Sequence, residues 1–407
     1  MPIARFLGCF LCGKDKGVGV VEDGDVPVIR IEGKSAHHQL SDSSFDSELE
    51  FSSAKDEKDT PLSTDTEPRR TNKALVVAAK GTYALVDHEF PNLEHGREVV
   101  IRNMATGLNP IDFKSVDFNF CLPEFPWVTG REMAGVVEVV GEEVEGIRVG
   151  DRVWTSTYYR DRRAGCFQQF VTVPAHTVLP LPSNLSFDEA ACLGVAALTA
   201  AMTLWRWLQV PMVPPAERTG REYLLVWGGS TVTGQFAIQI AARCGLDVIA
   251  VTSAKTRSLA ESLGARVVVR DGKSNDEIVD EIRGVAGEDI TRAIDLVGPS
   301  TANYCLKAFS RDEGRKCLFA PLAMISSKAE IPANVVVETV EMKQFVLDGE
   351  SRRFAVELNR LVESGEILLP GLEVLEGGLG VVVVVEGLER LKRGDMVGRK
   401  MVVRMES

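Results

Sequence analysis

The sequence predicts an α/β protein in which a β-rich module precedes a doubly wound parallel sheet. Residues 73–182 read as many short, β-branched strands separated by Gly, Pro and Asn. From residue 222 to residue 321, apolar strands alternate with amphipathic helices. That alternation requires parallel pairing with right-handed crossovers, so the second part is expected to be a nucleotide-binding type of sheet.

Length, charge and cysteine usage exclude several classes of protein. The 407 residues favour two or three domains, and 58 acidic against 46 basic side chains give a net charge of −12. This balance argues against nucleic acid or anionic lipid as the main partner. No run of about 18 apolar residues is found, so no transmembrane segment is predicted. Eight cysteines are too few for a disulfide scaffold, and residues 3–11 do not resemble a secretory signal, so a cytoplasmic location is expected.

Residues 1–72 are predicted to be a disordered acidic extension. They hold 9 basic and 14 acidic side chains, and residues 35–72 place their apolar side chains singly, without helical or strand period. The patch at residues 6–13 contains Cys9 and Cys12 and is compatible with an acylated anchor, a docking segment or an unstructured terminus.

After residue 182 the pattern changes to helices and buried strands. Ser186 with Glu189 three residues on forms a capping box, which predicts a helix that continues to residue 208. Further helices are expected at 230–245, 256–265 and 275–287, and strands at 222–229, 247–254, 266–271, 290–298 and 314–321. Residues 381–385 have strand propensity, but the following segment has helical periodicity, so the pattern leaves that region undecided.

A glycine-rich turn after the first strand of the sheet predicts a dinucleotide phosphate site. Gly229 and Gly234 take the first and third positions of G-x-G-x-x-G, and Thr231 stands in the second. Ser230, Thr231 and Thr233 could compensate with their hydroxyl groups. A plain connector between strand and helix is the alternative interpretation.

The loop after the second strand indicates which dinucleotide binds. An NAD site needs an acidic residue there, but no acid occurs before Glu261. Ser253, Lys255 and Arg257 suit the 2′-phosphate of NADPH instead, with a solvated basic loop as the alternative.

Two polar segments of the β-rich module are candidate active-site residues. Asn109, Asp112 and Lys114 follow one strand, and Arg131 and Glu132 precede another. Taken singly, Asn-Pro reads as a turn and Arg-Glu as a surface pair. Neither segment holds Cys or His, so no metal site is predicted. The histidines nearest to them in the chain are scattered at positions 88, 95 and 176.

Over residues 73–405 the chain resembles the medium-chain dehydrogenase/reductases. The resemblance rests on GLNPIDFK, TGREMAGVVEVVG, VGDRVW, FDEAACLGVAALTAA, VWGGSTVTGQFAIQIA and VGRKMVVRM. Within that family it resembles the zinc-free trans-acting enoyl reductases that accompany fungal polyketide synthases. The resemblance implies a GroES-like catalytic domain split into residues 73–190 and 326–407, and a Rossmann NADPH-binding domain at 191–325. It also makes residues 381–385 the start of a helix. In zinc-dependent relatives, a Cys and a His take the places of Asn109 and Arg131.

The resemblance also implies a set of site residues. Cofactor contacts are expected from Ile111, Asp112, Phe113, Lys114, Gly229, Ser230, Thr231, Val232, Thr233, Gly234, Ser253, Ala254, Lys255, Thr256, Arg270, Phe319, Ala320, Val397 and Gly398. The substrate cleft is expected along Gly194, Val195, Ala196, Ala197, Leu198, Thr199, Ala200 and Ala201. Where the family usually has a Tyr after the third strand, this chain has Arg270 and Asp271; Arg270 could still contact the 2′-phosphate.

The expected reaction is hydride transfer from NADPH to the β-carbon of an α,β-unsaturated thioester. Lys114 and Thr199 are the expected donors to the enolate oxygen or the nicotinamide amide. The proton would come from solvent or an unidentified acid, with Tyr158 and Tyr159 as candidates. A carrier-bound thioester and a polyketide synthase are the expected partners, and the expected oligomeric state is a monomer. A freestanding quinone or enone oxidoreductase and an inactive NADPH-binding interaction protein are the alternatives.

Overall fold

A computed structural model describes the backbone of residues 19–22 and 27–30, and residues 70–119, 122–158, 160–214, 216 and 220–405 in full. Strands β1 (Gly19–Glu22) and β2 (Pro27–Arg30) form a hairpin within the segment predicted to be disordered, and β2 pairs with β4 (Thr82–Glu89). The structure therefore differs from that prediction at these strands. The patch at residues 6–13 and Tyr159 lie outside the described residues.

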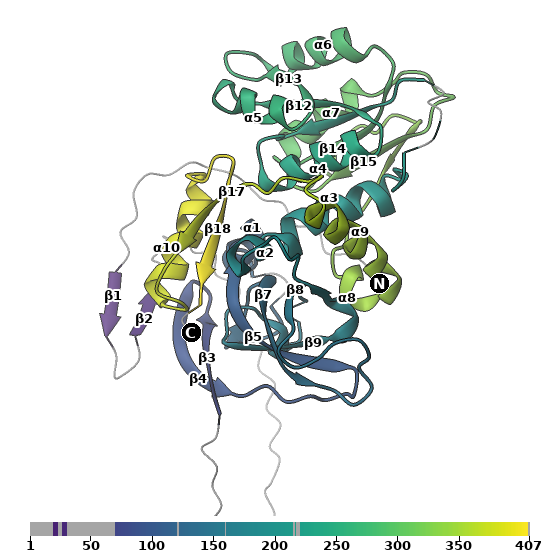
Figure 1. Ribbon diagram of the computed structural model, residues 1–407. Coiled ribbons are helices and arrows are strands. Elements are labelled where there is room, and N and C mark those ends of the chain that lie inside the picture. The colour runs from purple at the N-terminus through teal and green to yellow at the C-terminus, as the bar shows by residue number, and fades with distance from the viewer. Residues whose placement is uncertain are drawn as a thin grey trace, which may run out of the picture.

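A six-stranded parallel sheet forms one lobe of the molecule, at the top of Figure 1. Its order is β13-β12-β11-β14-β15-β16, the order of a doubly wound dinucleotide-binding sheet. The strands are β11 (Tyr223–Trp227), β12 (Asp247–Thr252), β13 (Ala265–Val269), β14 (Ile290–Asp295), β15 (Cys317–Pro321) and β16 (Val335–Val337). Because β16 pairs with β15, this sheet extends beyond the domain boundary expected at residue 325.

Helices cover both faces of the parallel sheet because side chains alternate along each strand. On β11, Leu224 and Val226 face one helix pair, whereas Leu225 and Trp227 face the other. The first pair is α4 (Val232–Arg243) and α5 (Arg257–Ser262), the latter preceded by η5 (Ala254–Thr256); the second is α6 (Asn275–Ala286) and α7 (Pro299–Ala308). The sequence had not indicated α7.

The other lobe is built from two mostly antiparallel sheets, which confirms the GroES-like β-rich module. One sheet joins the β1–β2 hairpin to β4, β3 (Thr71–Ala79) and β6 (Trp127–Val128). The second contains β5 (Glu98–Gly107), β7 (Glu132–Val140), β8 (Arg152–Ser156), β9 (Phe170–Pro174), β10 (Val178–Pro180), β17 (Gly371–Leu375) and β18 (Arg399–Arg404). β18 returns from the C-terminus to pair with β5, so this domain is split in sequence as expected.

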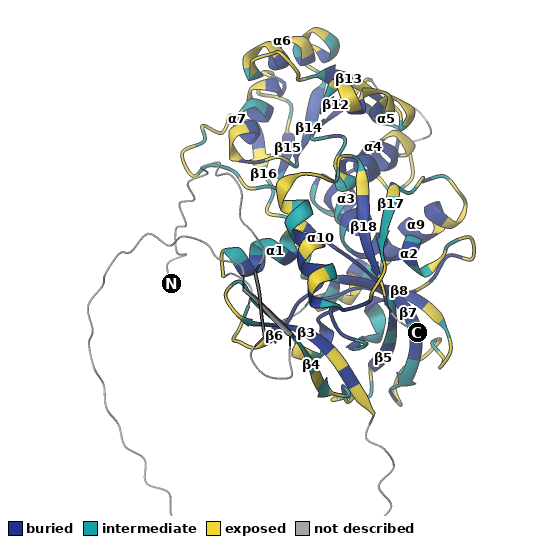
Figure 2. Ribbon diagram, turned by 90° about the vertical axis from the view of Figure 1, so that its left-hand side faces the viewer, coloured by how far each residue is buried: buried dark blue, intermediate teal, exposed yellow. Residues whose placement is uncertain are grey.

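A mixed helical segment connects the lobes. It runs through α2 (Phe187–Ala190), the π-helix η3 (Leu193–Ala197), α3 (Leu198–Met202) and the π-helix η4 (Thr203–Trp207). The predicted capping box is confirmed, since the Ser186 N–H donates to Glu189 Oε2 at 2.8 Å and the Glu189 N–H donates to Ser186 Oγ at 3.3 Å. By length and hydropathy Phe187–Trp207 could cross a membrane, the single such helix among the described residues, but 72% of its apolar window is buried in the protein. It is therefore typical of a core helix, dark blue in Figure 2.

The remaining helices lie beside the catalytic module or between the lobes. They are α1 (Pro110–Asp117), α8 (Gln344–Leu347), α9 (Arg352–Glu363) and α10 (Val381–Arg393), with the short turns η1 (Arg162–Ala164), η2 (Ala175–Thr177) and η6 (Gly349–Ser351). The Asn-Pro turn of the sequence is in fact the start of α1, because the Asp112 carboxylate accepts the Asn109 N–H at 2.8 Å. Residues 381–385 are helical, as the resemblance implies and against their strand propensity.

Candidate functional site

The glycine-rich turn lies between β11 and α4, where the backbone is too crowded for side chains. A Cβ on Gly234 would lie 2.5 Å from the Gly228 carbonyl oxygen, and a Cβ on Gly229 would lie 2.7 Å from Ala250 Cβ. Thr231 Oγ1 caps the helix by accepting the Gly234 N–H at 3.0 Å. The amides of Val232 and Thr233 then have no partner within the helix, since the first turn has no preceding carbonyls. The turn therefore fits a pyrophosphate at the start of α4.

The loop after β12 holds the residues expected to contact the 2′-phosphate. Ser253 Oγ lies 3.0 Å from Thr256 Oγ1, which in turn contacts Thr252 Oγ1 at 2.5 Å. Lys255 and Arg270 are exposed, and neither forms an ion pair among the residues that the structure describes. The loop after β12 thus offers hydroxyl groups and the Lys255 cation. Arg270, which follows the neighbouring strand β13, adds a second cation that is not ion-paired within the described part of the chain.

The start of β18 brings both lobes together. Gln235 of α4 donates through Nε2 to the Ser230 and Gly398 carbonyls, each at 3.1 Å. Two residues after Gly398, the Lys400 ammonium donates to Asn109 Oδ1 at 2.7 Å, at the start of α1. The predicted segments around residues 111–114, 230–234 and 397–398 therefore converge, as a cleft between catalytic and nucleotide domains requires.

A buried ionic cluster lies beneath this junction. Glu132 is fully buried, so its interpretation as a surface residue was wrong. Its Oε1 accepts hydrogen bonds from Asn109 Nδ2, at 2.8 Å, and from the ammonium of Lys400. Glu132 Oε2 accepts the N–H of Val195, in the π-helix η3, at 2.5 Å. Glu132 therefore connects β7, α1, β18 and the predicted cleft segment. Sequence reasoning missed Lys400, because nothing near it in the chain indicates its partner.

The cluster does not fit a zinc ion. Asn109 stands where zinc-dependent relatives have a Cys, and its side chain binds Glu132 and Lys400 instead. The Lys400 ammonium already supplies the cation among three oxygen acceptors, which belong to Leu108, Asn109 and Glu132, and the neighbouring Arg131 is itself cationic. Among the described residues, no three His, Cys, Asp or Glu side chains form a group suited to a metal.

Helix α1 carries two ionisable groups with perturbed pKa values. Burial raises the pKa of Asp112 to about 7, although the Asn109 N–H and the Lys400 charge act in the opposite direction. Its Oδ2 accepts the Asn109 N–H, whereas its buried Oδ1 has no hydrogen-bond partner among the described residues. Lys114 is half-buried, and burial lowers the pKa of its ammonium. Ile111 and Phe113 are also half-buried, so α1 presents Ile111, Phe113 and Lys114 toward accessible space while Asp112 caps it from within.

Only two side chains of the predicted cleft segment are accessible. Val195 and Thr199 are partly exposed and lie four residues apart, hence on one helical face. The other six members are packed in the core: Gly194, Ala196, Ala197, Leu198, Ala200 and Ala201. A Cβ on Gly194 would lie 2.5 Å from the Thr155 carbonyl oxygen, so this helix packs directly on β8.

The remaining expected site residues differ in how far they are exposed to solvent. Phe319 and Ala320 are fully buried in β15, and the Phe319 ring packs edge-on against Phe309 at 5.9 Å between centroids. Tyr158 is half-buried on the loop after β8. Val397 is exposed, beside Gly398.

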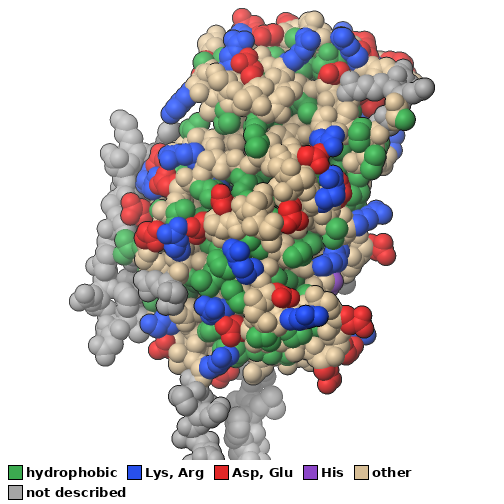
Figure 3. Space-filling view, in the orientation of Figure 1, with side chains coloured by type: hydrophobic (Ala, Val, Ile, Leu, Met, Phe, Trp, Pro, Cys, Tyr) green, Lys and Arg blue, Asp and Glu red, His purple; other side chains and the backbone are tan. Residues whose placement is uncertain are grey.

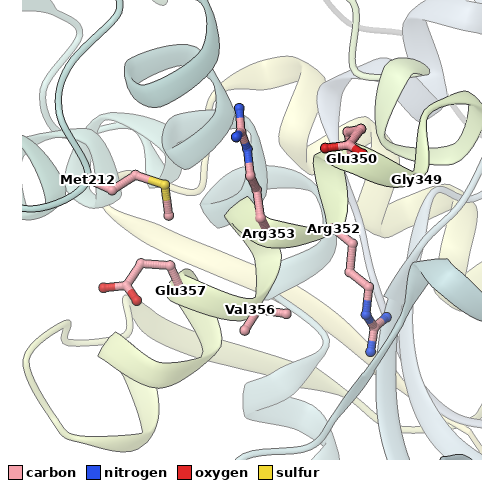
Figure 4. A pocket seen from close by; sticks show the side chains of 7 residues that line it. All are labelled: Met212, Gly349, Glu350, Arg352, Arg353, Val356 and Glu357. Atoms are coloured by element: carbon pink, nitrogen blue, oxygen red, sulfur yellow. The ribbon is translucent and has the colours of Figure 1, made fainter.

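An open depression beside α9 contains none of the predicted site residues. Figure 4 shows Met212, Glu350, Arg353 and Glu357 around it. The Arg352 guanidinium points away and donates to the His176 and Val178 carbonyls at 2.7 and 2.6 Å, which ties α9 to the β-rich module. In the space-filling view of Figure 3, acidic and basic side chains are interspersed on the visible face.

Comparison with known proteins identifies the family. The chain matches the alcohol dehydrogenase GroES-like domain over residues 95–183 and the zinc-binding dehydrogenase domain over residues 233–356. It is 30% identical over 351 residues to trans-enoyl reductase FSL5 of Gibberella zeae, covering 81% of this chain and 96% of that relative. Trans-enoyl reductase buaC of Petromyces alliaceus is 29% identical over 354 residues, covering 82% and 96%.

Solved structures share the fold. The quinone oxidoreductase of Pseudomonas syringae superposes with a TM-score of 0.67 at 23% identity, covering 82% of this chain and 99% of that one. The CurK enoyl reductase gives 0.66 at 21% identity, with the same coverage. The chain therefore belongs to the medium-chain dehydrogenase/reductase family, and it is an oxidoreductase.

Proposed function

We propose that this oxidoreductase uses NADPH to reduce the carbon–carbon double bond of an α,β-unsaturated thioester carried by a partner polyketide synthase. The convergence of the glycine-rich turn, α1 and Gly398 at the start of β18 carries the proposal, because hydride transfer needs cofactor and substrate in one cleft. The relatives named trans-enoyl reductases support the substrate class and the partner. The free, buried cysteines of the described chain are compatible with a cytoplasmic location.

The residues of the cleft have distinct roles in this proposal. When bound, NADPH would supply the hydride that the β-carbon accepts. The electron pair of the carbon–carbon double bond would then form the double bond between the α-carbon and the carbonyl carbon, and the carbonyl pair would move onto the thioester oxygen. Lys114 and Thr199 donate to that oxygen or orient the nicotinamide amide. The α-carbon then takes a proton from solvent or from an acid such as Tyr158. The reaction is proposed to need no zinc, because Asn109, Lys400 and Glu132 already satisfy one another.

The test is NADPH oxidation by the full chain with an enoyl thioester on pantetheine or on a carrier protein. We expect reduced thioester in amounts equal to the NADPH consumed. Lys114→Ala is expected to lower kcat about 100-fold, as for loss of one oxyanion donor, while the exposed Lys328→Ala serves as control. An unchanged kcat in Lys114→Ala would remove that residue from the chemistry.

The same assay separates the two alternatives. Turnover of quinones or free enones without any enoyl thioester activity would indicate a freestanding quinone or enone oxidoreductase. NADPH binding without turnover of any acceptor would indicate an interaction protein that has lost catalysis.

A further inference from the structure

A carboxylate lies at the end of β12, although the sequence after that strand supplies none before Glu261. It belongs to Asp271, which follows the next strand, β13. The Arg270 N–H donates to the Thr252 carbonyl at 2.9 Å and so extends the pairing of the two strands by one residue. Asp271 Oδ2 then accepts the N–H of Ala254 at 2.6 Å. Tertiary structure thus places an acid where the chain itself has none.

The charges around this carboxylate are mixed. Lys255 follows Ala254, and Arg270 precedes Asp271, yet neither is ion-paired with it among the described residues. Arg257 is paired with Glu261 at 2.7 Å, and Lys273 is paired with Glu281. The ends of β12 and β13 therefore carry the exposed carboxylate of Asp271 and two cations, Lys255 and Arg270, that are not ion-paired among the described residues.

A 2′-phosphate and a free ribose hydroxyl respond to that carboxylate in opposite ways. The phosphate carries between one and two negative charges near neutral pH, so Asp271 repels it and competes with it for the Ala254 N–H. A 2′-hydroxyl can instead donate to the carboxylate, as the acid at the end of the second strand does in NAD sites.

We propose that Asp271 sets the cofactor selectivity of the site. Its negative charge opposes the attraction of Lys255 and Arg270 for the 2′-phosphate, so the site accepts NADH in addition to NADPH. The proposal rests on the nicotinamide site of the proposed function. The residue that distinguishes the two cofactors is then Asp271 after β13, outside the loop after β12 that usually carries this role.

The test is calorimetric binding of 2′,5′-ADP and 5′-AMP, which differ only in the 2′-phosphate, together with NADPH and NADH. Asp271→Asn keeps an oxygen acceptor for the Ala254 N–H but removes the charge. We expect it to bind 2′,5′-ADP and NADPH about tenfold more tightly and NADH about threefold more weakly. The exposed Asp280→Asn changes net charge equally and should change neither affinity, and Lys255→Ala should weaken 2′,5′-ADP selectively.

Two negative results are distinguishable. If Asp271→Asn shifts the affinities for 2′,5′-ADP and 5′-AMP equally or not at all, Asp271 does not set selectivity, although the nucleotide site stands. If the unmodified protein binds none of the four nucleotides, the nicotinamide site itself is refuted and the proposed function fails with it. Thermal unfolding of each variant excludes misfolding as the cause of lost affinity.

Discussion

Replacing Lys400 by Met tests whether the buried cluster stabilises the junction between the lobes. Lys400 is 3% exposed and Glu132 is 0% exposed at the side chain, so the substitution leaves a buried carboxylate that keeps Asn109 and Val195 as donors but loses its cation. Breaking a buried ion pair from one side costs about 3–5 kcal/mol. The carbonyl of Leu108, which accepts the ammonium at 3.0 Å, also loses its donor.

Urea unfolding followed by tryptophan fluorescence measures this cost. With a slope of about 3 kcal/mol per molar urea, the expected loss lowers the midpoint by about 1 M or more. The double variant with Glu132→Gln removes both charges and is expected to recover most of the loss, because no unpaired charge remains buried.

A matched control is Lys307→Met, which breaks an exposed pair with Asp276 at 2.7 Å. It should leave the midpoint nearly unchanged, since solvent screens exposed pairs. If Lys400→Met is no more destabilising than this control, or if the double variant is as unstable as the single one, the cluster does not act as a buried ion pair.

Three further predictions follow from local geometry. Asp112 keeps its proton up to pH about 7 when folded but releases it near pH 4 when unfolded, so native stability falls as pH rises between those values. Asp112→Asn should remove that pH dependence. As pH rises from 4 to 8, the variant should become more stable than the unmodified protein by up to about 4 kcal/mol in free energy of unfolding. Denaturation at several pH values measures this difference. Gly234→Ala places a Cβ 2.5 Å from the Gly228 carbonyl oxygen and should weaken NADPH more than tenfold in a fluorescence titration; unchanged affinity would contradict a pyrophosphate at this turn. Ser186→Ala removes the capping box and should lower the free energy of unfolding by about 1 kcal/mol without changing kcat. A fall in kcat would mean that the start of this helix contributes to the cleft.

Local patterns were sufficient for much of the fold. Some features depend only on residues close together in the chain, and the sequence was therefore enough to predict them. They are the capping box at Ser186, the turn at Gly229–Gly234 and the alternation of strands and helices. Packing decided α10 instead: Val381, Val384, Val385 and Leu388 recur at helical spacing and are buried together against β18. That buried face outweighs the strand propensity of β-branched residues.

The candidate site also combines features that the sequence predicted with features that only tertiary contacts produce. The sequence by itself determined the glycine turn, the hydroxyl-rich loop after β12 and the position of Lys114, because each needs only a residue type at a known place beside a strand or helix. Only the tertiary structure joined Glu132 to Lys400, restricted the accessible cleft segment to Val195 and Thr199, and brought Asp271 to Ala254. Those features depend on which strands pair and which helix face is covered, and such contacts between distant residues leave no local periodicity to detect.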